Sequence, residues 1–179
     1  FVRKYPEAKL IVKIATTVEL MDMLKKGMLD VIVIYDRQVQ SDNWECPVKI
    51  REPLLFFAGN SNGFSGKHVE LAELGRENFI LTEKGCTYRK VIDDFIEARD
   101  IELNWNLDIG DTMAIIDFVS KDMGISLLPE YCISEYLKQG SIREIYVDDF
   151  EAELYLQVIY DRRKWMSPVK EAFIDLCSR

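Results

Sequence analysis

The side chains best suited to acid–base catalysis are sparse in this chain. His68 is the only histidine, and it stands in a polar, loop-like stretch. The carboxylates at Asp93-Asp94 and Asp148-Asp149 are adjacent in sequence, so their side chains splay apart instead of converging on one substrate atom. The sequence contains no nucleophile elbow, P-loop or dinucleotide-binding fingerprint. We therefore expect that the chain is not an enzyme.

The four cysteines do not form a metal-binding motif. They stand at positions 46, 86, 132 and 177, too far apart in sequence for the usual ligand spacing. An even count allows two disulfides in an oxidising compartment, but Cys132 and Cys177 fall on apolar faces of predicted helices, as small core residues do. We expect reduced thiols, a cytoplasmic location, and no metal or other cofactor.

Hydroxyl side chains stand where several helices are predicted to begin. Thr16 or Thr17 can cap one helix, Thr87 a second, and Asp111-Thr112 a third. The backbone N–H groups at a helix start suit a carboxylate or another anion. A threonine at this position is also the usual cap, so a structural role and a ligand-binding role both remain open.

The composition is that of a globular domain without a nucleic-acid-binding face. The chain has 179 residues, 48% of them hydrophobic, and a net charge of −8. Nucleic-acid-binding modules usually carry a basic face, and the densest basic cluster here is the short run Arg162–Lys164, expected to be a solvated turn or a polar partner contact. No apolar run approaches the ~18–20 residues of a membrane span.

Two helix–glycine–strand units indicate an α/β fold. In the first, a helix ends near Gly27 and is followed by the apolar strand 31–34. In the second, a helix ends at Gly124 and the strand 125–128 is stopped by Pro129. Short strands made only of apolar residues predict parallel sheets covered on both faces.

Two long extended segments suggest how the chain is divided. They span 48–60 and 154–160, and they bracket a second set of alternating elements. Because such a pair can cross between two α/β lobes, we expect lobe I to comprise 1–58 and 154–179 and lobe II 59–153, with the glycine-rich loop after Ala58 as the boundary. A ligand would bind in the cleft between the lobes, at the carboxyl ends of the strands. Further predicted elements are a strand at 10–14, a polar turn at 41–47, a short helix at 69–74, strands at 79–81, 107–109 and 142–147, and a last helix opened by Ser167-Pro168.

The ordered set of these motifs resembles the effector-binding domain of LysR-type transcriptional regulators over nearly the whole chain. The residues that carry the resemblance are Tyr5-Pro6, the strand 10–14, Leu24…Gly27…Asp30 with the strand 31–34, Glu52-Pro-Leu, Gly85-Cys-Thr-Tyr-Arg89, Gly124-Ile-Ser-Leu-Leu-Pro129, and the closing strand with its helix through Phe173-Ile-Asp-Leu.

The resemblance implies two Rossmann-like lobes joined by two crossover strands, as in type 2 periplasmic binding proteins. It implies a small-molecule effector, for which the predicted helix starts favour an anion, and a homodimer or homotetramer assembled through the helix at about 18–26. DNA would be bound only by an N-terminal winged helix-turn-helix. These residues lack that module, and they also lack the first strand of the effector domain. The alternative on the same fold is an extracytoplasmic solute-binding protein of a transporter.

Carried over by position, the resemblance assigns the ligand contacts to Thr17 and Tyr35 in lobe I and to Cys86, Thr87 and Thr112 in lobe II. Family members that sense peroxide carry a reactive cysteine near the matching arginine and a second cysteine further on. Cys86 is one place too early for that pattern, and Ile96 stands near the position of the second thiol. A peroxide switch is therefore a minor hypothesis.

Overall fold

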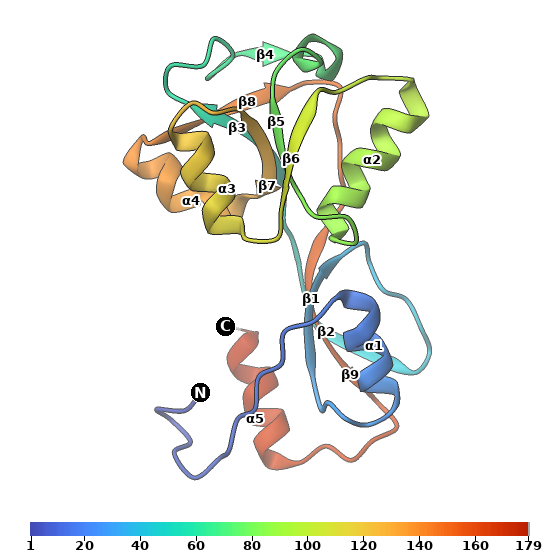
Figure 1. The fold of residues 1–179 in the computed structure, drawn as a ribbon. Coiled ribbons are helices and arrows are strands. Elements are labelled where there is room, and N and C mark those ends of the chain that lie inside the picture. The colour runs from blue at the N-terminus through green and yellow to red at the C-terminus, as the bar shows by residue number, and fades with distance from the viewer. Residues whose placement is uncertain (179) are drawn as a thin grey trace. The chain divides into compact units, whose positions relative to one another are not determined.

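The computed structural model describes residues 1–178, which form two compact units (Figure 1). Unit 1 comprises Phe1–Arg51 and the chain from Leu154 onward, and unit 2 comprises Glu52–Glu153. The first crossing between the units falls seven residues before the sequence-based boundary, because β3 (Leu54–Gly59) pairs with two strands of unit 2. The two units are described separately.

Unit 1 contains a three-stranded antiparallel sheet in the order β1-β9-β2. The strands are β1 (Ile32–Asp36), β2 (Trp44–Arg51) and β9 (Tyr155–Asp161). The prediction of a parallel sheet is wrong here, because the returning strand β9 runs between β1 and β2 in the opposite direction to both. The polar turn predicted at 41–47 is also wrong in its second half, which belongs to β2.

Two helices cover this sheet, one on each side (Figure 1). Helix α1 (Thr17–Lys25) begins with a reciprocal capping box in which Thr16 and Glu19 each accept a backbone N–H from the other. Its Leu24 is fully buried with Ile32 and Ile159. Helix α5 (Pro168–Cys177) begins as predicted, with the Ser167 hydroxyl as cap and proline at the first helical position.

The stretch 10–14 is not a strand, contrary to the sequence prediction. Residues 9–16 have no regular secondary structure, and the side chain of Ile14 is 98% exposed. A strand exists only when a neighbouring strand accepts and donates its backbone hydrogen bonds. Among the described residues none lies in a ladder with this stretch, so its apolar composition does not produce a strand.

The turn that follows β1 is held by one buried amide. Gln157, with no exposed surface, accepts the N–H of Val39 at 2.9 Å and donates to the carbonyls of Asp36 (3.2 Å) and Arg37 (3.1 Å). These three bonds tie the chain after Tyr35 to β9.

Replacing Gln157 by leucine is therefore expected to lower the free energy of unfolding by about 2–3 kcal/mol, because the substitution leaves up to three backbone groups without partners. Urea denaturation measures the loss. The exposed Gln38 provides the control, and Gln38→Leu is expected to change stability by less than about 0.5 kcal/mol. Equal stabilities for the two variants would contradict the assigned role.

Unit 2 contains a six-stranded mixed sheet in the order β4-β8-β3-β7-β5-β6. Strand β3 is antiparallel to both of its neighbours, whereas β5 is parallel to β6 and β7, and β4 is parallel to β8. The parallel prediction therefore holds for only part of this sheet. The remaining strands are β4 (His68–Val69), β5 (Phe79–Thr82), β6 (Trp105–Ile109), β7 (Ile125–Pro129) and β8 (Ile142–Val147).

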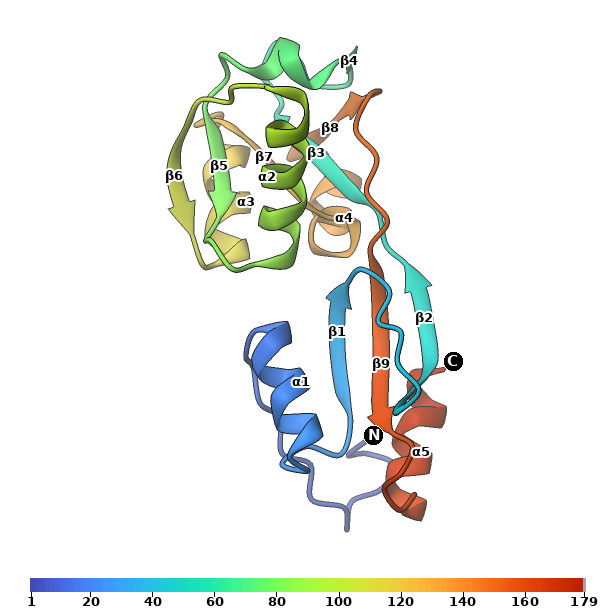
Figure 2. The same ribbon diagram turned by 90° about the vertical axis from the view of Figure 1, so that its right-hand side faces the viewer.

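Helices cover both faces of this sheet. Figures 1 and 2 show α2 (Thr87–Arg99) on one face and α3 (Thr112–Ser120) with α4 (Glu130–Gln139) on the other. The short helix predicted at 69–74 is a single 3-10 turn, Leu71–Leu74. Gly124 lets β7 approach the chain before β5, because a side chain there would collide with the carbonyl oxygen of Asn78. In the described part of the chain, no helix has the length and apolarity needed to span a membrane.

One core cluster of unit 2 lies between the sheet and helices α3 and α4. Phe57 from β3 occupies its centre with no exposed surface. The remaining buried members are Ile80, Ile115, Ile116, Val119, Leu128, Ile133 and Ile142. This packing fixes where the first turns of α3 and α4 stand.

Candidate functional site

The start of α2 contains two of the predicted ligand contacts, Cys86 and Thr87. Cys86, with φ −73° and ψ 138°, is the residue before the helix, and its side chain accepts no hydrogen bond from the first turn. Thr87 is the first helical residue, so the prediction that it caps the helix is wrong by one position. The preceding Gly85 adopts φ +100°, a conformation that favours glycine, which allows the sharp turn from β5 into α2.

Carboxylates already occupy the starts of α3 and α4. Asp111 accepts the N–H groups of Met113 (2.8 Å) and Ala114 (3.1 Å). Glu52, which precedes β3 in sequence, accepts the N–H of Tyr131 at 2.7 Å. A helix start attracts negative charge. At the starts of α3 and α4 this charge is supplied by a carboxylate of the protein itself. At the start of α2, the residue before the helix is a cysteine, and its side chain does not act as a cap.

Tyr88 connects two of the predicted ligand contacts. Its pKa is raised far above the ordinary value, first by burial and then by a hydrogen bond and charge interaction with the Cys86 thiol, while a hydrogen bond with Thr112 acts in the opposite direction. The starts of α2 and α3 therefore meet at this phenol. Cys86, Thr87 and Thr112 are all half-buried, so the structure brings the three predicted residues of lobe II together.

A second phenol and thiol extend this group toward α4. Burial raises the pKa of Tyr131 and that of Cys132, and each is further perturbed by the other and by Glu52 and Cys86. The sequence did not identify Tyr88, Tyr131 or Glu52 as part of a site. Their adjacency depends on contacts between segments far apart in the chain, such as Glu52 and Tyr131, although Tyr88 could have been suggested by its place in the first turn of α2. All four cysteines are free thiols.

Arg89 anchors the first turn of α2 to the sheet. Its side chain is 1% exposed, yet it forms an ion pair through Nε with Asp93 at 2.9 Å. One terminal nitrogen donates to the Thr82 carbonyl at 2.9 Å and to Asp108 at 2.5 Å. Burial alone would lower the pKa of Arg89, but the hydrogen bonds to the two carboxylates outweigh it and raise the pKa.

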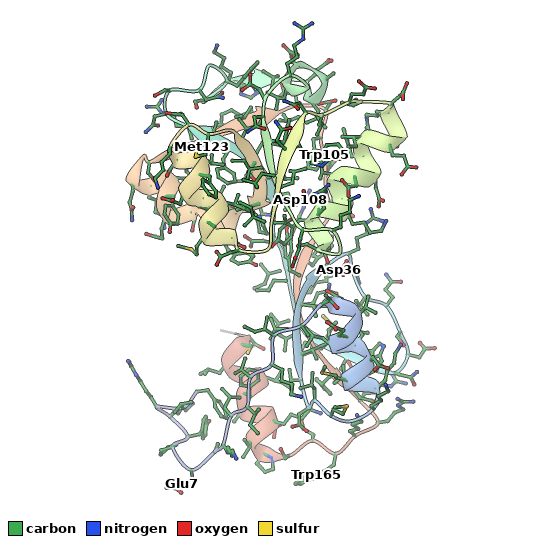
Figure 3. All side chains as sticks on the ribbon, in the orientation of Figure 1. Glu7, Asp36, Trp105, Asp108, Met123 and Trp165 are labelled. Atoms are coloured by element: carbon green, nitrogen blue, oxygen red, sulfur yellow. The ribbon has the colours of Figure 1, made fainter. Side chains whose placement is uncertain are left out.

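An aromatic ring completes the surroundings of this guanidinium. The Trp105 ring centroid lies 5.4 Å from the central carbon of Arg89, a cation–π distance, and Trp105 and Asp108 both belong to β6 (Figure 3). The other terminal nitrogen is buried without a partner in the part of the chain that the structure describes. The network thus joins α2 to β5 and β6 and fixes the position of Thr87, two residues earlier.

The two remaining predicted contacts belong to unit 1. Thr17 is the first residue of α1, and the cap is Thr16, which resolves the choice left open by the sequence. Tyr35 lies in β1 opposite Leu156 and is half-buried. It directly precedes the turn that Gln157 holds.

A two-unit α/β architecture, with mixed or antiparallel sheets flanked by helices, is that of type 2 periplasmic binding proteins and of regulatory domains that share their fold. The LysR substrate binding domain model matches residues 1–179, and the chain belongs to this family. Solved structures of such domains have the same fold. The regulatory domain of CcmR from Synechocystis PCC6803, in complex with 2-PG, superposes with a TM-score of 0.83 at 20% identity, covering 99% of this chain and 85% of that one.

A second solved structure carries a different ligand. The effector binding domain of QuiR in complex with shikimate gives a TM-score of 0.71 at 16% identity, covering 92% of this chain and 78% of that chain. At these identities both comparisons establish the fold alone.

The curated relatives are transcriptional regulators. YwqM of Bacillus subtilis (strain 168), an uncharacterized HTH-type transcriptional regulator, is 29% identical over 98% of this chain and 60% of its own length. The HTH-type transcriptional activator CmpR of a Synechocystis strain is 22% identical over 98% of this chain and 58% of its own length. The chain thus spans about 60% of the length of the curated relatives that it matches.

Proposed function

We propose that this domain binds a small anionic effector and controls transcription as part of a LysR-type regulator. The observation that carries the proposal is the start of α2, where the side chain of Cys86 does not cap the helix and where Tyr88 interacts with Thr112 at the start of α3. The positive end of the helix dipole and the neighbouring hydroxyls of Thr87, Tyr88 and Thr112 suit a carboxylate or phosphate. Thr17 and Tyr35 of unit 1 are proposed as further contacts.

The named ligands of the fold relatives support an anion. Shikimate, bound to QuiR, is a carboxylate, and the CcmR domain is described in complex with 2-PG. Effector binding would act on DNA binding elsewhere in the protein, and only a difference in effector affinity between two conformations can shift that equilibrium. The names of the relatives favour this role over that of a transporter's solute-binding protein or of an enzyme.

Two further features are proposed with the function. The full protein acts as a cytoplasmic homodimer or homotetramer, in which α1 contributes to the interface. The exposed surface of α1 supports this proposal, since Val18 is 80% exposed and Lys25 and Lys26 form a charged rim. DNA would be contacted through a helix-turn-helix outside these residues.

Calorimetric titration of the protein with a panel of small carboxylates, including 2-PG and shikimate, tests the anion proposal. We expect at least one to bind, and we expect Thr87→Val to weaken its binding about tenfold or more, the effect of losing one charge-assisted hydrogen bond. The methyl ester of a bound carboxylate should not bind. Lys90→Ala is the matched control, because Lys90 lies on the same helix and is exposed and paired with Asp94 at 2.7 Å.

Three results would contradict the proposal. They are the absence of binding by every carboxylate in the panel, equal binding of acid and ester, and equal affinity of the wild type and Thr87→Val. Chemical conversion of a bound ligand, followed by chromatography, would instead indicate an enzyme.

A further inference from the structure

A glycine-rich loop connects β3 to β4 in unit 2 (Figure 1). It contains the dipeptide Asn62-Gly63. Gly63 is exposed and, beyond its two chain neighbours, no described atom lies within 4 Å of the position that a side-chain Cβ would take. Asparagine is a chemically labile residue, and a following glycine leaves its own backbone nitrogen unshielded. The Asn62 amide is therefore open to attack by the nitrogen of Gly63.

The Asn62 side chain is held through both atoms of its amide. Its Oδ1 accepts the backbone N–H of Phe64 at 2.8 Å, which forms an Asx turn. Its Nδ2 donates to a carboxylate oxygen of Glu77 at 2.9 Å. Glu77 lies in the turn before β5, 15 residues further along the chain. This second hydrogen bond therefore joins the loop to that turn.

The Phe64 N–H lies at the atom where negative charge develops during amide hydrolysis. When the Gly63 nitrogen forms a bond to Cγ of Asn62, the carbonyl oxygen Oδ1 becomes an oxyanion. A backbone N–H that already donates to this oxygen stabilises the charge. The amide nitrogen then leaves as ammonia, together with the proton that the Gly63 nitrogen loses. Water opens the resulting cyclic imide, and the product is aspartate or isoaspartate.

We propose that Asn62 is a site of spontaneous deamidation, and that this modification breaks the link between the loop and the turn before β5. In the aspartate product a carboxylate oxygen replaces the Nδ2 donor opposite Glu77. Two carboxylates at hydrogen-bond distance repel each other, where the amide and the carboxylate attracted. The modified protein therefore loses a contact that holds the loop. The inference does not depend on the effector proposal.

Peptide mass mapping of the full-length protein, after incubation in mildly alkaline buffer, tests the modification. We expect Asn62 to deamidate about tenfold faster or more than Asn60, which lies in the same loop but precedes a serine. Gly63→Ala should slow the reaction at Asn62 by a similar factor. Alanine fits at this position, because the site is open and the backbone is not left-handed. Equal rates at Asn62 and Asn60, or in the wild type and Gly63→Ala, would overturn the proposal.

Hydrogen exchange in the loop tests the consequence of the modification. In full-length Asn62→Asp we expect the amides of residues 62–67 to exchange about fivefold faster or more than in the wild type. Adding Glu77→Gln should restore slow exchange, because the glutamine amide can donate to the new carboxylate. Glu77→Gln alone is the matched control and should leave exchange unchanged.

Two results would overturn the assigned consequence. One is equal exchange in the wild type and Asn62→Asp. The other is faster exchange that Glu77→Gln does not reverse, since it would show that repulsion by Glu77 is not the cause. The deamidated fraction of the wild type, separated by ion exchange, gives the same readout if Asn62→Asp does not fold.

Discussion

Phe57→Ala is expected to lower the free energy of unfolding by about 3–5 kcal/mol, the usual loss for a large aromatic side chain removed from a packed core. Phe57 has no exposed surface and stands on β3 at the centre of the unit 2 sheet. Its removal leaves a cavity between the sheet and helices α3 and α4, which together carry Thr112 and Tyr131. Unit 2 should therefore lose both stability and the order of its candidate site.

Chemical denaturation monitored by circular dichroism measures this loss. Met123→Ala is a suitable control, because Met123 is 50% exposed (Figure 3) and its truncation should cost less than about 1 kcal/mol. A loss below 1 kcal/mol for Phe57→Ala would show that Phe57 is not in the core of this unit.

Arg89→Met is expected to lower the free energy of unfolding by about 2–4 kcal/mol, because it removes a buried, hydrogen-bonded ion pair. Methionine preserves much of the aliphatic volume but leaves the Thr82 carbonyl without its donor and two carboxylates, Asp93 and Asp108, without their shared cation. The carboxylates are about 40% exposed and can be hydrated, which keeps the loss at the lower end of the range for buried pairs.

The adjacent residue provides a matched control for this prediction. Lys90 also pairs with an aspartate four residues along α2, but its side chain is 71% exposed, so Lys90→Met should cost less than about 0.5 kcal/mol. Arg89→Lys keeps the positive charge but lacks the planar guanidinium with its several donors. Its loss of stability should lie between those of Arg89→Met and Lys90→Met. If Arg89→Met and Lys90→Met were equally stable in urea, the anchoring role of Arg89 would be disproved.

The helices could be predicted from the sequence because their signals are local. The spacing of Leu20, Met21 and Leu24 predicts the apolar face of α1, and Ser167-Pro168 predicts the start of α5. Hydroxyl and carboxylate caps act within three residues of the helix start, so the α-helix starts predicted from a cap were correct to within one position, as at Thr87. The end of α3 was less well predicted, because the helix ends at Ser120, four residues before Gly124. The family resemblance also lay in short motifs at ordered intervals, and the match to the LysR substrate binding domain confirms it.

The strands depended on partners that no local pattern specifies. The stretch 10–14 has a stronger strand composition than Trp44–Arg51, yet only the latter is a strand, because β9 lies beside it. The direction of pairing was equally undetermined, since the same apolar strand can sit in a parallel or an antiparallel ladder.

The sequence alone therefore determined the family, the helices and the individual helix-start residues of the candidate site. Only the tertiary structure decided that Tyr88 joins Cys86 to Thr112, that Glu52 occupies the start of α4, and that Arg89 is buried against β6. Helix periodicity and capping are set by residues within one or two turns of each other. Convergence of side chains from separate elements is set by how the core packs, and that involves residues tens of positions apart.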